Sequence, residues 1–95
     1  QSFNVDKLFL GVTGFSLKRG LTTTNLLESE VKQAMIRASK EVILVAHSQK
    51  FEQIYYHTFA DWDQIRALVT DSGIPESLKF ALKKRGVKVF IVQID

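Results

Sequence analysis

The chain has 95 residues, 45% of them hydrophobic, and its net charge of +3 corresponds to a pI of about 9.3. This composition predicts one globular unit or part of one. The absence of cysteine excludes disulfides and thiolate metal sites, and no apolar run approaches the roughly 20 residues of a membrane span, so we expect a soluble, cytoplasmic protein. The basic excess is too small to identify a nucleic-acid binder but suits small anionic ligands.

The first predicted elements are a strand over residues 5–12, a turn over residues 11–14 and a loop to Arg19. Gly20 is a predicted site of positive φ before the threonines at 22–24. A helix is predicted over residues 26–39, because apolar residues with helical spacing form one face that should pack on a sheet: Leu27, Val31, Ala34, Met35 and Ala38.

Side chains at the start of this helix predict how it begins. Asn25 can accept the backbone N–H of Glu28, and Glu28 can reach back to the backbone N–H of Asn25, which is a capping box. Glu28 and Lys32 form an i, i+4 ion pair in the favoured orientation. These features predict a well-defined helix N-terminus with free backbone N–H groups, which is also a potential anion site.

The second half of the chain alternates strands and one helix. Residues 42–46 are apolar at every position, which predicts a parallel strand covered on both faces. Residues 51–65 are predicted to be irregular with a helical turn, although residues 55–59 could be a short extended piece. Residues 67–70 are predicted to be a buried strand. A helix should then begin with Pro75 at its first position and end at Gly86, with Leu78, Ala81 and Leu82 facing inward. The last predicted strand covers residues 87–94.

This order predicts an α/β, Rossmann-like fold with right-handed crossovers and a mostly parallel sheet flanked by helices. All strands of a parallel sheet end at one edge, where ligands of such folds bind. We therefore expect one binding rim that includes the helix start at Asn25 and the residues that follow the strands, namely Thr13, His47, Ser48, Lys50, Thr70 and Asp71.

Each candidate residue at the rim also has a structural interpretation. The threonines after Gly20 could serve simply as helix caps rather than as an anion site. Lys50 could be solvated rather than bind a phosphate. His47 could bind a hydroxyl or transfer a proton, or be structural, and two distant histidines do not make a metal motif. Asp71 could contact a ligand, but it is expected to cap either the region of the Pro75 helix or a turn. The aromatic residues are expected in the core or at a subunit interface rather than stacked on bases: Tyr55, Tyr56, Phe59 and Trp62.

Five short segments of the sequence are informative in this order and spacing: residues 6–11 (DKLFLG), 20–23 (GLTT), 30–35 (EVKQAM), 48–51 (SQKF) and 70–73 (TDSG). Together they resemble the C-terminal sensor domain of DeoR-type transcriptional regulators of bacterial sugar metabolism. The resemblance implies that residues 1–95 are the second half of a sensor domain similar to ribose-5-phosphate isomerase and CoA transferases. It also implies that a helix-turn-helix domain and the first half of the sensor domain precede residue 1.

The resemblance further implies a repressor fragment that binds a phosphorylated sugar and forms homo-oligomers, while operator DNA binds to the domain outside this chain. No cofactor, metal or membrane contact is expected. The effector-binding residues that we predict are Thr13, Gly20, Thr22, Thr23, Lys32, His47 and Lys50. Two positions depart from the family, which usually has an acidic residue in place of Thr13 and Asp in place of His47.

The departure at Thr13 weighs against catalysis, because isomerase-like enzymes place a general-base carboxylate in this turn and threonine cannot abstract a carbon-bound proton. We therefore predict binding without turnover. The alternative is a fragment of a sugar-phosphate isomerase-like enzyme, for which His47 is the one obvious base. A third hypothesis is direct nucleic-acid binding through the basic cluster at residues 83–85.

Overall fold

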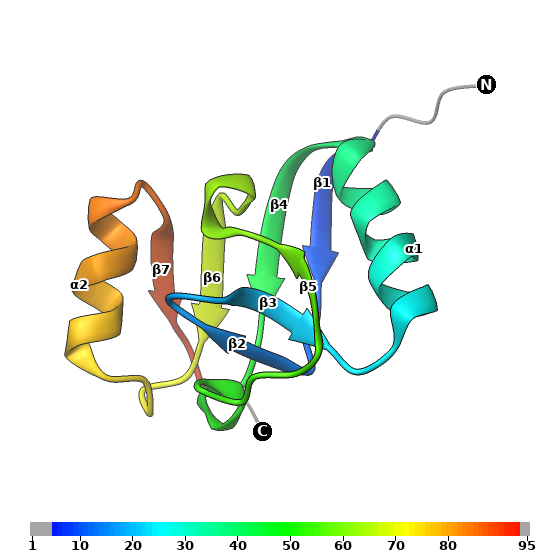
Figure 1. The fold of residues 1–95 in the computed structure, drawn as a ribbon. Coiled ribbons are helices and arrows are strands. Elements are labelled where there is room, and N and C mark those ends of the chain that lie inside the picture. The colour runs from blue at the N-terminus through cyan, green and yellow to red at the C-terminus, as the bar shows by residue number, and fades with distance from the viewer. Residues whose placement is uncertain (1–4, 94–95) are drawn as a thin grey trace.

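The computed structural model describes residues 5–93 and shows an α/β fold (Figure 1). Four strands form a parallel sheet in the spatial order β1 (Val5–Leu10), β4 (Ser39–Val45), β6 (Ala67–Thr70) and β7 (Lys88–Ile91). An antiparallel sheet contains β2 (Gly14–Ser16), β3 (Gly20–Thr23) and β5 (His57–Ala60). The helices are α1 (Leu26–Arg37), α2 (Glu76–Lys84) and the 3₁₀ turns η1 (Ser48–Lys50) and η2 (Trp62–Gln64).

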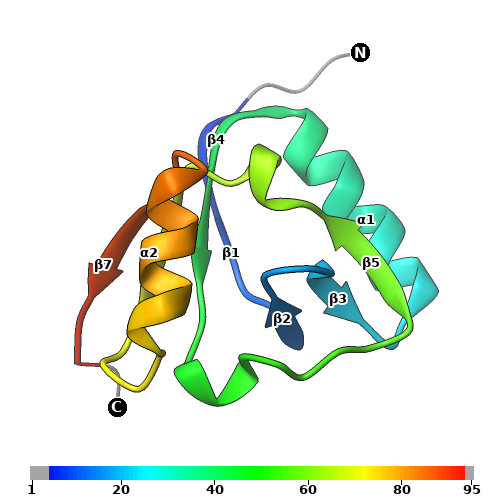
Figure 2. The same ribbon diagram turned by 60° about the vertical axis from the view of Figure 1, so that its left-hand side comes forward.

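All connections of the parallel sheet cross the same face. The chain steps in one direction, from β1 through β4 and β6 to β7, and right-handed crossovers place every connecting segment on one side of such a sheet. Figure 2 shows α1, α2 and the small antiparallel sheet together on that side. Val42 and Leu44 point to this face and are buried, whereas Val45 is exposed on the other. The prediction that both faces of this strand are covered is therefore wrong for residues 5–93.

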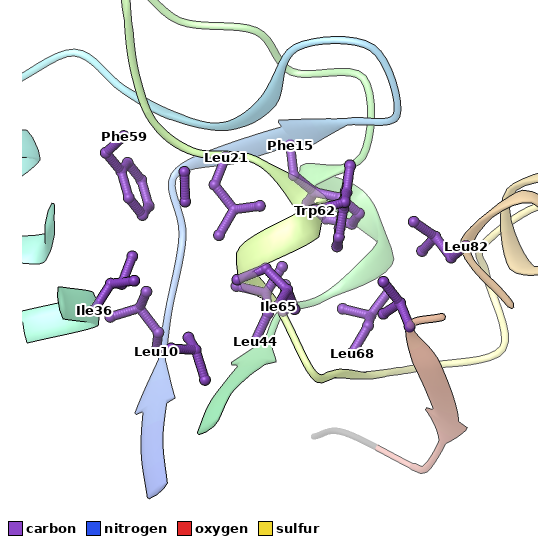
Figure 3. Close-up of a cluster of buried hydrophobic side chains, with 14 of the residues drawn as sticks. Leu10, Phe15, Leu21, Ile36, Leu44, Phe59, Trp62, Ile65, Leu68 and Leu82 are labelled. Atoms are coloured by element: carbon purple, nitrogen blue, oxygen red, sulfur yellow. The ribbon is translucent and has the colours of Figure 1, made fainter. Parts of the chain in front are cut away.

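The core lies between the parallel sheet and the layer formed by the small sheet and the helices (Figure 3). Trp62 is fully buried, its ring meets Phe15 edge to face, and its Nε1–H donates to the carbonyl of Ser16 at 2.9 Å. Phe59 is buried as well, which confirms the predicted core role of these two aromatic residues, whereas Tyr56 is exposed. A buried indole with a satisfied N–H fixes the small sheet to the turn at η2.

The small sheet is the part of the fold that the sequence did not predict. The predicted loop at residues 15–19 contains part of β2, and the segment predicted to be irregular contains β5 besides the helical turn η2. These strands have three or four residues, too few to show a period, and β5 pairs with β3 from far away in the sequence. Gly20 does have the predicted positive φ, at 78°.

The helix ends largely agree with prediction. Asn25 Oδ1 accepts the N–H of Glu28 at 2.9 Å, which confirms the N-cap. The reciprocal bond of the capping box is not formed, because the Glu28 carboxylate binds Thr23 instead. Helix α2 begins after Pro75, one residue later than predicted, and ends before Gly86, whose φ is 88°. Residue 94 of the predicted last strand lies outside the described residues.

The helical spacing predicted that the apolar stripe of α1 faces the core. In the structure this stripe is largely exposed. Leu27 is 70% exposed, and Val31 and Met35 are also exposed, whereas Ser29 and Ile36 are buried. Helix α1 contacts β3, β4 and β5 through this other side. The spacing thus correctly identified an apolar stripe, but it did not show that this stripe is exposed within residues 5–93. Within residues 5–93, no helix is long and apolar enough to cross a membrane.

Candidate functional site

The carboxyl ends of the four parallel strands meet at one edge, which is the lower edge of the sheet in Figure 1. The segments that follow β1, β4 and β6 lie there and form the rim: residues 11–13, 47–50 and 71–73. The parallel order of the sheet therefore brings Thr13, His47 and Asp71 to the same edge, although they are far apart in the sequence. Two separate polar networks hold the rim in place.

The first network joins the end of β1 to α1 and β3. Lys32 Nζ donates to the carbonyl oxygen of Gly11 at 2.9 Å and lies 3.2 Å from Glu28 Oε2, which confirms the predicted pair with Glu28. Thr23 Oγ1 donates to Glu28 Oε1 at 2.6 Å. The hydrogen bond from Thr23 and then the bond from Lys32 hold the pKa of Glu28 below its ordinary value. We call these four residues, Gly11, Thr23, Glu28 and Lys32, the Lys32 network.

The ammonium of Lys32 is held in one position rather than free in solvent. The side chain of Lys32 is only 16% exposed, and Nζ lies 5.0 Å from the centroid of the Phe59 ring. Contact with the ring face favours the cation, and the carboxylate of Glu28 balances its charge. The result is an ammonium that is fixed beside the end of β1 and already paired with the Glu28 carboxylate.

The second network joins the ends of β4 and β6 through Asp71. Asp71 Oδ2 accepts the backbone N–H of Ser48 at 2.9 Å, and Oδ1 accepts the N–H of Gly73 at 2.8 Å. Hydrogen bonds from the Ser48 side chain, the Ser48 backbone and the Gly73 backbone lower the pKa of Asp71 to about 2. The bond to Gly73 confirms the predicted turn. A Cβ at Gly73 would overlap the Ser48 hydroxyl, so glycine allows this close approach.

Three predicted effector-binding residues are buried inside the hairpin β2–β3. Thr22 Oγ1 donates to the carbonyl of Gly14 at 3.2 Å and accepts the N–H of Tyr55 at 3.1 Å. Thr23 is part of the Lys32 network, and Gly20 lies at the other end of β3, against Ala60. In this conformation the two hydroxyls hold the fold together, so a role of these residues in binding effector stays a prediction.

Thr13, His47 and Lys50 are accessible at the rim. The side chain of His47 is 48% exposed, with Nδ1 3.8 Å from Asp71 Oδ2. Thr13 and Lys50 are partly exposed, and their side chains form no hydrogen bond or ion pair with other residues in 5–93. No such contact joins Lys50 to the start of α1 among these residues, although we expected both at one rim.

Sequence reasoning missed the links that connect distant segments, namely Lys32 to Gly11 and Ser48 to Asp71. The spacing of Asp71 and Gly73 signals a turn, but nothing in the sequence indicates that the same carboxylate holds Ser48. Within the described range, no three His, Asp or Glu side chains are placed to hold a metal ion. In the basic cluster at residues 83–85, Arg85 pairs with Asp61 and Asp63 at 3.6 and 3.1 Å.

Comparison with known proteins identifies the family. The family model described as DeoR C terminal sensor domain matches residues 1–72. A protein of Escherichia coli O157:H7 named for transcriptional repression of the aga operon is 35% identical over 92 residues, which are 97% of this chain and 34% of that protein. The HTH-type transcriptional repressor GlcR of Bacillus subtilis (strain 168) is 30% identical over 95 residues, 100% of this chain and 36% of the repressor.

A third relative is the HTH-type transcriptional regulator IolR of Bacillus subtilis (strain 168), 35% identical over 76 residues, 80% of this chain and 30% of the regulator. The chain thus spans about a third of the length of the curated relatives that it matches. Those relatives are named as regulators and repressors, not as enzymes. The chain belongs to the DeoR C-terminal sensor domain family.

Proposed function

We propose that this chain is the effector-binding part of a bacterial transcriptional repressor of sugar metabolism and that its effector is a phosphorylated sugar. The match to the sensor-domain family over residues 1–72 carries this proposal. In the intact repressor, operator DNA would bind to a helix-turn-helix domain outside residues 1–95. The names of two relatives as HTH-type proteins support this division.

The rim at the end of β1 is the proposed effector site. The ammonium of Lys32 is fixed there by the carbonyl of Gly11 and the carboxylate of Glu28, and Lys50 adds a second cation on the neighbouring segment. Thr13 and His47 can exchange hydrogen bonds with sugar hydroxyls. Gly20, Thr22 and Thr23 then contribute by shaping the hairpin that borders the site. A sheet that continued beyond β1 in the way of Rossmann-like folds would place this site at a topological switch point.

We further propose that the site senses its ligand without converting it. Thr13 offers no carboxylate base, and Asp71, whose pKa is about 2, is engaged by Ser48 and Gly73. An effector that binds one arrangement of the repressor better than another would shift its affinity for the operator through coupled binding. The physiological response is then release or retention of DNA rather than a chemical product.

Calorimetry on the intact repressor tests this proposal. A panel of pentose and hexose phosphates would be titrated alongside the unphosphorylated sugars and inorganic phosphate. We expect one phosphorylated sugar to bind at least about tenfold more tightly than its unphosphorylated form, because a charged hydrogen bond contributes about 1.5–3 kcal/mol. Equal affinity for both forms would refute phosphate recognition. Isomerisation of the bound sugar would favour the alternative, a sugar-phosphate isomerase-like enzyme.

A further inference from the structure

A surface groove of about 700 Å³ lies between α2 and the closed end of the β2–β3 hairpin. Figure 1 shows this end of the hairpin directed toward α2. The floor of the groove is apolar and comes from three segments: Leu17 at the end of the hairpin, Ile54 after η1 and Ala81 on α2. Ile54 is 48% exposed, so this floor is open to solvent. We call this surface the α2 groove, and the three rim segments do not line it.

Hydrogen bonds hold the hairpin side of the α2 groove in place. The backbone N–H of Arg19 donates to Ser16 Oγ at 2.9 Å across the end of the hairpin, and the carbonyl of Ser16 accepts the Nε1–H of Trp62. The backbone N–H of Glu52 donates to the carbonyl of Phe15 at 2.7 Å, which ties the segment after η1 to β2. The groove is therefore formed before any partner binds, and binding requires little additional ordering of the chain.

Exposed cations surround the floor of the α2 groove. Lys18 and Arg19 lie at the end of the hairpin, and Lys84 lies on α2. Within residues 5–93, the side chains of these three residues form no ion pair with a carboxylate. Arg85 also lines the groove but is already paired with two carboxylates, and Glu52 is the one acidic residue of the lining. The groove therefore carries a net positive charge and is complementary to an anionic surface.

The floor and the cations together select one class of occupant. Small-molecule sites combine apolar walls with a few polar groups that fix the orientation of the ligand. In the α2 groove the one buried polar residue is Ser16, whose hydroxyl and carbonyl already accept the N–H groups of Arg19 and Trp62. Phosphates of DNA would satisfy the cations but leave the apolar floor unused, and the same groove of a second copy would bring like charges together. A protein surface that combines carboxylates with apolar side chains matches both parts of the groove.

The strands beside the α2 groove indicate that this protein surface is helical. An extended peptide binds by adding a strand to a free sheet edge. Both edges of β2 are already occupied, one by β3 and the other by the bridge between Phe15 and Phe51. An amphipathic helix needs no such edge, because its backbone hydrogen bonds are internal and its apolar face can lie in a groove.

We propose that the α2 groove binds an acidic amphipathic helix of a partner protein. The apolar face of that helix lies on the floor of the groove, and its flanking carboxylates pair with Lys18, Arg19 and Lys84. The charges fix the orientation of the helix, whereas the apolar contacts form the dry centre of the interface. This inference goes beyond the proposed effector function and does not depend on it, because the groove and the rim share no lining residue.

A selection of helical peptides against the intact protein tests the proposal. The probe is a displayed library of amphipathic helices of roughly 15 residues, with acidic, basic and neutral polar residues in equal proportion beside the apolar stripe. Peptides that also bind Ile54→Ser are removed, so the retained peptides depend on the floor of the groove. Their dissociation constants are then measured for the wild type, for Lys84→Glu and for two control variants.

The two controls match the two kinds of change. Lys83→Glu is the control for charge, because Lys83 is the exposed neighbour of Lys84 on α2 but lines a separate groove beside β7. Tyr56→Ser is the control for loss of apolar surface, because Tyr56 is 85% exposed in the segment before β5 and does not line the α2 groove.

We expect the retained peptides to be enriched in carboxylates and to bind Lys84→Glu at least about tenfold more weakly than the wild type, with less than about a threefold change for either control. Retained peptides without an acidic excess, or the absence of retained peptides, would overturn the proposal. Equal losses for Lys83→Glu and Lys84→Glu would also overturn it, because diffuse attraction between charges would then explain the binding.

Two further measurements distinguish the other occupants. If Lys84→Glu loses more affinity for non-specific duplex DNA than Lys83→Glu does, the groove is a nucleic-acid surface and the proposal fails. If Lys84→Glu lowers the mass of the intact protein in light scattering, the occupant is a second copy and the proposal fails as well. Circular dichroism shows whether each variant folds, and Lys18→Glu and Ala81→Gln replace Lys84→Glu and Ile54→Ser if either does not.

Discussion

Replacement of Lys32 by methionine tests the Lys32 network most directly. Lys32→Met keeps a long apolar side chain beside Phe59 but removes the ammonium that donates to Gly11 at 2.9 Å and pairs with Glu28 at 3.2 Å. A hydrogen bond to a charged group contributes about 1.5–3 kcal/mol and an exposed ion pair at most about 1 kcal/mol. Gly11 is exposed and Glu28 keeps its bond from Thr23, so water can replace part of the loss. We therefore expect the free energy of unfolding to fall by about 1–2 kcal/mol.

Urea unfolding measures this change, and Lys79→Met is the matched control. Lys79 is also a helix lysine, and its Nζ lies 3.5 Å from the carboxylate of the highly exposed Glu76, but within residues 5–93 its side chain has no hydrogen bond or ion pair to another element. For an m-value of about 2 kcal/mol/M, the midpoint of Lys32→Met should fall by roughly 0.5–1 M, whereas that of Lys79→Met should fall by less than about 0.3 M. Equal shifts for the two variants would show that Lys32 does not join β1 to α1 in solution.

Three other changes test separate parts of the structure. Because the pKa of Asp71 is lowered from 3.8 to about 2, its contribution to stability is complete above pH 4 and is lost as the pH falls toward 2. Thermal midpoints of Asp71→Asn should vary less over this range than those of the wild type. In urea unfolding, Gly14→Ala should lower the free energy of unfolding by about 3 kcal/mol, since a Cβ there would overlap the carbonyl of Gln53. Gly11→Ala should lower it by less than about 0.5 kcal/mol, since a Cβ at Gly11 would meet open space. Lys50→Ala should weaken binding of the phosphorylated effector by about 1.5–3 kcal/mol in calorimetry with little change in stability, and unchanged affinity would exclude Lys50 from the site.

The sequence predicted the features that depend on nearby residues. Apolar runs and helical spacing located the four strands of the parallel sheet and both helices, and their alternation predicted parallel pairing. Asn25 as N-cap, Gly20 with positive φ and the Glu28–Lys32 pair also follow from local geometry. Short segments distributed along the chain were sufficient for the family, because their order and spacing are more specific than any one of them.

Only the tertiary structure showed which surface each apolar residue meets. Periodicity shows that Leu27, Val31 and Met35 form a stripe, but their exposure on α1 depends on how the helix docks against β3, β4 and β5. In the same way, the continuous apolar run of β4 did not indicate that one face is left open, which follows from the direction of the crossovers.

The polar networks at the rim also depend on tertiary structure, because their partners are far apart in the sequence. Lys32 binds the carbonyl of Gly11 from 21 residues away, and Asp71 binds Ser48 from 23 residues away. Contacts over such separations form only when strand order and helix docking bring the segments together, and no local pattern encodes them. A charged side chain in a sequence therefore indicates a possible bond, whereas its partner is determined by the fold.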